Sequence, residues 1–159
     1  MQKLESEHLI AGERIRSSCE VTIAVLNPAN AKSIGYIPAG TSEDAAAAVA
    51  AAREAWVQWS RLPAVERANP IKIAARNMRA YARELAELVT LENGKPFDDS
   101  LGGVEAGIGT LEQYAELGPL HRGKSLQGSY MASDMMVYHP YGVAAVIVPW
   151  NDPIAIACG

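Results

Sequence analysis

"VAAVIVPWND", residues 143–152, decides the fold, because six apolar residues run without interruption into a turn. No polar residue alternates with the apolar ones in residues 143–148, which is typical of a strand covered on both faces. Such a strand implies a parallel sheet with helices on both sides, and these sheets bind ligands beyond the carboxyl ends of their strands. The sequence therefore predicts an open α/β fold with a binding site at the turn.

The turn after this strand carries side chains of different chemistry. Pro149 lacks an N–H and ends the strand, and Trp150 offers a flat apolar wall with one donor. Asn151 offers an amide beside the start of a helix, where it could stabilise an oxyanion. The alternative is that Asn151 only shapes the turn. Asp152 is expected to cap the helix, with Pro153 at its first position.

Two short strands are predicted upstream, over residues 21–26 and 33–37, joined by the turn signal "NPAN". A helix should follow, capped by Thr41 with Asp44 three residues later. The spacing of Trp56 and Trp59 in this helix favours a place in the core.

Two further helical regions are indicated by apolar residues at spacings of three and four. The first is either one long helix or a kinked pair. Asn69 and Pro70 suit its start, and "ENGKP", residues 92–96, supplies a terminating glycine, a cation and a proline. The second, residues 101–117, contains four glycines that form no phosphate-binding pattern. Close packing against another helix is their expected use.

Composition excludes several classes of protein. The 159 residues suit one domain, and 49% hydrophobic with 20% charged residues is typical of a soluble globular chain. A net charge of −4 with scattered basic residues gives no reason to expect nucleic acid. No apolar stretch reaches the roughly 20 residues that span a membrane, and no secretion signal is evident. We expect a cytoplasmic protein.

Metal sites and disulfides are not expected either. The chain has only two cysteines, Cys19 and Cys158, and its three histidines are far apart without ligand spacing.

Several of these stretches, taken in order, resemble the aldehyde dehydrogenase superfamily, N-terminal portion only. They are "NPAN", "AAAAVAAAREAWVQWSRLPAVER", "LENGKP", "EQYAEL" and "YHPYGVAAVIVPWNDP". The resemblance implies the N-terminal part of an open, Rossmann-like parallel-sheet domain that binds NAD or NADP. Residues 1–122 would form its first segment, residues 123–142 a β-hairpin arm that pairs subunits into a dimer or tetramer, and residues 143–159 the first strand and helix start of the sheet.

The resemblance also implies roles for the residues around the turn. Asn151 would donate its amide to the oxyanion formed when a cysteine thiolate attacks an aldehyde. Four residues would line the nicotinamide side of the cofactor cleft: Ile147, Val148, Pro149 and Trp150. In the family the nucleophile, and the glutamate that activates water, lie beyond the matching strand. Neither Cys19 nor Cys158 fits the role of nucleophile.

Alternatives stay open at this point. The chain could be a non-catalytic assembly module, or it could belong to a reductase or acylating branch of the superfamily. Asp152 stands where an apolar residue is usual in the family, so it could cap the helix or bias the pocket against anionic aldehydes. A chain with no strands beside residues 143–148 is expected to expose their apolar side chains.

Overall fold

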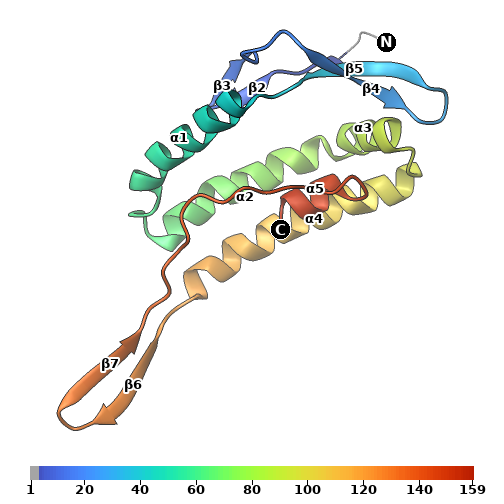
Figure 1. The fold of residues 1–159 in the computed structure, drawn as a ribbon. Coiled ribbons are helices and arrows are strands. Elements are labelled where there is room, and N and C mark those ends of the chain that lie inside the picture. The colour runs from blue at the N-terminus through green and yellow to red at the C-terminus, as the bar shows by residue number, and fades with distance from the viewer. Residues whose placement is uncertain (1–3) are drawn as a thin grey trace.

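Strands form the N-terminal part of the molecule, at the top of Figure 1, in a computed structural model that describes residues 4–159. A three-stranded open sheet has the order β1-β5-β4, with β1 parallel and β4 antiparallel to β5. A separate hairpin pairs β2 with β3. The bounds are β1 Leu4–Glu5, β2 His8–Ile10, β3 Glu13–Ile15, β4 Thr22–Asn27 and β5 Lys32–Pro38. The two strands predicted over residues 21–26 and 33–37 are confirmed.

Helices make up most of the remaining chain. They are α1 Ser42–Trp59, α2 Ala64–Ala80, α3 Ala82–Asn93, α4 Phe97–Leu117, the short 3-10 helix η1 Gly118–Leu120 and α5 Pro153–Ala157. Figure 1 shows α2 and α4 side by side, with α5 lying against α4. The core lies between α2, α3 and α4, where Ala75, Ala86, Val104 and Ile108 are buried.

The start of α1 is the capping box that the sequence predicts. The backbone N–H of Asp44 donates to Thr41 Oγ1 over 3.1 Å, and the N–H of Thr41 donates to Asp44 Oδ2 over 3.0 Å. Asp44 also accepts a hydrogen bond from Ser17 Oγ at 2.6 Å and one from the Ser18 N–H at 3.0 Å. These bonds, led by the one from Ser17, hold the pKa of Asp44 well below its usual range.

Two helix predictions are wrong. Pro70 lies inside α2, so Asn69 caps no helix there, and the break comes instead at Tyr81, with φ −108° and ψ 14°. The buried contacts that α2 makes through Ala68 and Ala75 outweigh the local cost of a proline, about 3 kcal/mol. The two tryptophans of α1 are also not in the core, because none of the residues of α1 is buried.

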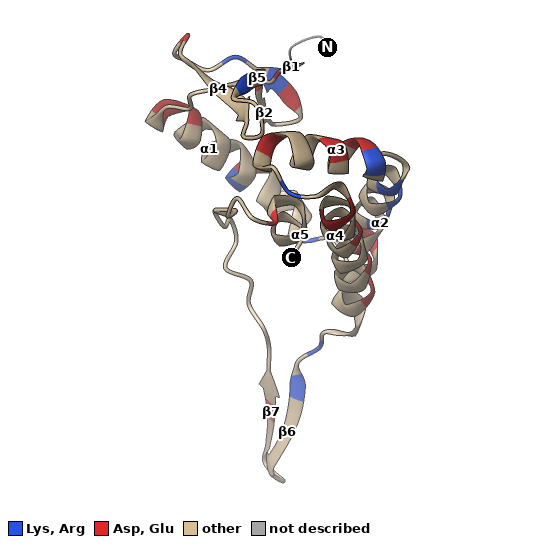
Figure 2. Cartoon of the chain, turned by 90° about the vertical axis from the view of Figure 1, so that its right-hand side faces the viewer, with Lys and Arg blue, Asp and Glu red and all other residues tan. Residues whose placement is uncertain are grey.

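A hairpin formed by β6 Lys124–Ser129 and β7 Ala132–Met136 projects away from the helices. Its side chains are exposed throughout, and Figure 2 shows that few of them are charged. The hairpin predicted within residues 123–142 is therefore present. Its pairing with another subunit stays a prediction.

Residues 143–148 do not form the predicted strand. They cross the helices on their way to α5 and pair with no strand of the described residues, 4–159. Val146 is 68% exposed and Ile147 is 94% exposed. A strand needs hydrogen-bonding neighbours, and the part of the chain that is described supplies none beside this segment. The apolar run is thus exposed, as expected for a chain without those neighbours.

No helix among the described residues is both long enough and apolar enough to cross a membrane.

Candidate functional site

Three turns that are far apart in the sequence meet at one groove. "NPAN" contributes Pro28, "ENGKP" contributes Asn93, the last residue of α3, and the "PWND" turn contributes Pro149 and Trp150. These turns carry motifs on which the family resemblance rests. The fold therefore gathers the distinctive parts of the sequence at one place.

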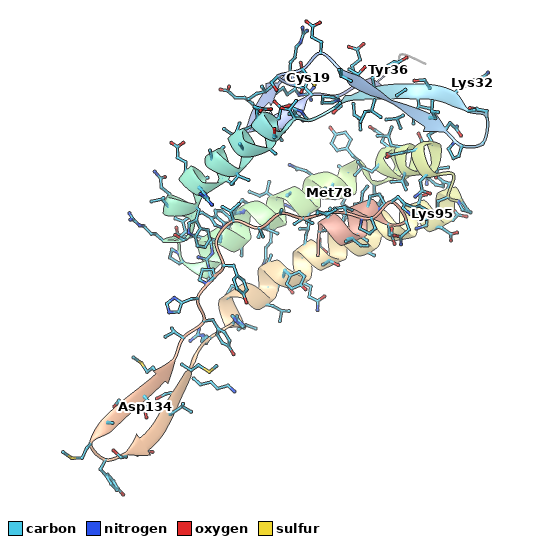
Figure 3. The ribbon with its side chains drawn as sticks, in the orientation of Figure 1. Cys19, Lys32, Tyr36, Met78, Lys95 and Asp134 are labelled. Carbon is cyan, nitrogen blue, oxygen red and sulfur yellow. The ribbon has the colours of Figure 1, made fainter. Side chains whose placement is uncertain are left out.

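The "ENGKP" turn holds the "PWND" turn through two side chains. Asn93 Nδ2 donates to the carbonyl oxygen of Trp150 over 2.9 Å, and Lys95 Nζ lies 3.5 Å from the carbonyl oxygen of Asn151. Asn93 also shapes its own turn, because its Oδ1 accepts the N–H of Lys95 at 3.1 Å. Figure 3 shows Lys95 at the junction of α3 and α4, beside α5.

Gly94, between these two residues, is required by geometry. It ends α3 in the left-handed conformation, with φ 80°, which L side chains rarely adopt. A Cβ atom at this position would also lie 2.8 Å from Pro28 Cγ. The glycine thus sets the direction of the turn and allows "NPAN" to approach it.

Asp152 has a different role from the predicted one. It occupies the N-cap position of α5, but its side chain makes no capping hydrogen bond. Its Oδ1 instead lies 3.4 Å from Lys95 Nζ, and the carboxylate rests against Gly103, where a Cβ would clash with it. The ion pair was not predictable because the two residues are far apart in the sequence.

Two of the four glycines in α4 serve the close packing that the sequence predicts. Gly103 and Gly107 are buried, and a Cβ at Gly107 would lie 3.0 Å from the Ile154 carbonyl oxygen. Gly102 and Gly109 have no neighbour within 4 Å of such a Cβ. The short helix α5 is therefore seated on a glycine-lined face of α4.

The five predicted site residues lie together at this end of the chain, on an open surface. Ile147, Pro149, Trp150 and Asn151 are exposed and Val148 is half-buried. The carboxamide of Asn151 makes no hydrogen bond to the described residues, so its donor is available. Asn151 follows an exposed segment and not the strand covered on both faces that the sequence predicts. Its role and those of the four wall residues stay predictions.

Neither cysteine has the properties of an activated nucleophile. Burial raises the pKa of the Cys158 thiol, which disfavours the reactive thiolate. Cys19 Sγ donates to the Ala39 carbonyl oxygen at 3.1 Å, in the strand region far from the groove. Among residues 4–159, no group of three His, Cys, Asp or Glu side chains could hold a metal ion.

The groove has a partly apolar lining. Val148, Pro149 and Trp150 contribute apolar surface to it, and the indole of Trp150 is 79% exposed. Ile147 and Asn151 do not line this groove.

Comparisons with known proteins show which family the chain resembles. Residues 15–159 match the aldehyde dehydrogenase family. Malonate-semialdehyde dehydrogenase 1 of Geobacillus thermodenitrificans is 35% identical over 153 residues, which cover 96% of this chain and 32% of the relative. Aminoaldehyde dehydrogenase 2 of Zea mays is 39% identical over 146 residues, which cover 85% of this chain and 28% of the relative.

Solved structures give the same result. An NAD-dependent aldehyde dehydrogenase from Sinorhizobium meliloti matches with a TM-score of 0.94 and 27% identity, covering 98% of this chain and 32% of that one. An NADP-dependent enzyme from E. coli matches with a TM-score of 0.93 and 32% identity, covering 97% of this chain and 32% of that one. The predicted α/β class and the resemblance to N-terminal cofactor domains are confirmed. The chain spans about a third of the length of the relatives it matches.

Proposed function

Because the chain belongs to the aldehyde dehydrogenase family, we propose that it forms the part of an NAD(P)-dependent enzyme that presents the oxyanion donor. The reaction would oxidise an aldehyde to a carboxylic acid. The observation that carries this proposal is the contact between the "ENGKP" and "PWND" turns, which holds Asn151 by its backbone and leaves its amide free.

Asn151 would act on the substrate oxygen. When a cysteine thiolate supplied from outside this chain attacks the aldehyde carbon, negative charge develops on the carbonyl oxygen. The Asn151 amide would donate a hydrogen bond to that oxygen. A fixed donor of this kind is typically worth a factor of about 10²–10³ in kcat when water is excluded. The exposed Asn151 of this chain would need further protein to cover it.

The neighbouring residues would hold the cofactor. Ile147, Val148, Pro149 and Trp150 would line the nicotinamide side of an NAD or NADP site, and the nicotinamide would accept the hydride of the aldehyde. Relatives whose names carry NAD and NADP support both cofactors. The apolar wall would keep water away from the carbon that loses the hydride.

Assembly and location follow as further parts of this proposal. The exposed, weakly charged hairpin β6–β7 would pair with a second copy of the chain in a homo-oligomer, a dimer or a tetramer. Both cysteines are free thiols, which suits a reducing compartment such as the cytoplasm.

The second candidate is a non-catalytic assembly module, which the exposed hairpin and the exposed residues 146–147 favour. Reduction of NAD+ or NADP+ by aldehydes, followed with the 159-residue chain alone and with a longer protein containing it, separates the two. We expect turnover only in the longer protein. Absence of turnover there would leave the assembly module. Turnover by the short chain that Cys158→Ala abolishes would make Cys158 the nucleophile.

A further inference from the structure

The segment that leads into the "PWND" turn, residues 143–148, does not hold the turn in place. Residues 143–148 pair with no strand in the described part of the chain, and Ile147 is 94% exposed. The turn is nevertheless fixed, because Asn93 and Lys95 reach the carbonyl oxygens of Trp150 and Asn151.

We propose that Asn93 and Lys95 are positioning residues that set the direction of the Asn151 carboxamide; this inference rests on the proposed function. Both side chains bind backbone atoms, so they fix the main chain on either side of the Asn151 Cα. They leave the Asn151 side chain free to meet the substrate. Small displacements of a catalytic donor have large effects on rate, which gives this support a functional purpose.

Two features make the support rigid. The Asn93 side chain is fixed at its second end, since its Oδ1 accepts the Lys95 N–H at 3.1 Å. Gly94 holds this turn in a left-handed conformation against Pro28. The donor to Trp150 therefore comes from a turn with little conformational freedom of its own.

Asp152 belongs to the same support. Its carboxylate lies 3.4 Å from Lys95 Nζ and fits against Gly103, which has no side chain to displace it. The side chains are 25% exposed for Lys95 and 35% exposed for Asp152. The charge of Asp152 is thus matched by a cation of this chain, and we assign it to holding Lys95 in place rather than to selecting among aldehydes.

Amide hydrogen exchange of the 159-residue chain tests the support itself. The N–H groups of Ile156 and Cys158 bond to the carbonyl oxygens of Asp152 and Ile154, so together they report on α5 from its N-cap to its C-cap. Asn93→Ala should speed their exchange about two- to tenfold, the effect of one hydrogen bond. Asn69→Ala, an exposed asparagine of α2, is the matched control and should leave these rates unchanged. Equal rates in both variants would overturn the inference.

Kinetics of the longer enzyme test the functional part. Asn93→Asp keeps the acceptor for the Lys95 N–H but loses the donor to Trp150, so kcat should fall about two- to tenfold with KM nearly constant. Lys95→Met should lower kcat by a similar factor. Lys95→Arg keeps the positive charge, so its kcat should lie between those of Lys95→Met and the parent enzyme. In an Asn151→Ala background, Asn93→Asp should have no further effect, because both changes act through one donor.

The outcomes separate the two claims. If Asn151→Ala lowers kcat but Asn93→Asp does not, or if the two effects multiply, the positioning role is wrong and the proposed function stands. If Asn151→Ala leaves kcat unchanged, the proposed function is wrong and the positioning role is wrong with it. Faster exchange in Asn93→Ala would then show a purely structural contact.

Discussion

Gly107 of α4 lies directly against the backbone of Ile154 in α5. A Cβ atom at Gly107 would lie 3.0 Å from the Ile154 carbonyl oxygen and 3.2 Å from the Ala155 Cα atom. These are backbone atoms, which cannot move aside as a flexible side chain would. The site-bearing end of the chain is therefore held to the helical core through a position where only glycine fits without a shift.

Substitution of two glycines in α4 tests this packing. Gly107→Ala and Gly109→Ala should gain the same helix propensity, but only the former presses on α5. We expect Gly107→Ala to be less stable than Gly109→Ala by about 1–3 kcal/mol, the usual cost of overpacking. Urea unfolding of both variants measures the difference. Equal free energies of unfolding would show that α5 is not seated on this glycine.

The lowered pKa of Asp44 predicts how the free energy of unfolding depends on pH. Its pKa is held low by the bonds from Ser17, Ser18 and Thr41, so its contribution to stability is complete above the pKa of an unfolded aspartate, about 3.9. That contribution is lost as pH falls below this value toward the folded pKa. The free energy of unfolding should therefore fall less steeply in Asp44→Asn than in the parent between about pH 5 and pH 2. Parallel curves would contradict the assignment.

If the exposed β6–β7 hairpin pairs two copies of the chain, a charge on it should change the oligomeric state. Met135 of β7 is 79% exposed, and a charge there should weaken pairing of the hairpin with a second copy. Met135→Glu should shift the chain toward monomer in sedimentation velocity. Val65→Glu, which places the same charge on an apolar residue of α2 that is 60% exposed, is the control. An unchanged oligomeric state in Met135→Glu would exclude the hairpin from the interface.

Local signals predicted much of the fold. The capping box at Thr41 and the β4–β5 pair depend on short-range chemistry, and both are present. The hairpin within residues 123–142 was implied by the family resemblance, and β6 and β7 form a hairpin there. The helix start predicted at Asn69 and Pro70 was wrong because packing of Ala68 and Ala75 carries α2 through Pro70. Local propensity cannot report such tertiary support.

The candidate site was predicted only in part. The sequence predicted a turn at Pro149, Trp150 and Asn151, and the structure has a turn there, whereas the roles of these residues stay predictions. It did not pair Lys95 with Asp152, or Asn93 with the Trp150 carbonyl, since these contacts join segments more than fifty residues apart. The apolar run at residues 143–148 predicts a buried strand, and such burial requires neighbouring strands. The described residues contain no strand beside this run, so it is exposed.

The kcat of Asn151→Ala in the longer enzyme tests the central claim most directly. Loss of one oxyanion donor should lower kcat by a factor on the order of 10²–10³, with KM for the cofactor little changed. Asn69→Ala, an exposed asparagine on α2, should keep the parental rate. Turnover of aldehyde by Asn151→Ala at the parental rate would contradict the account.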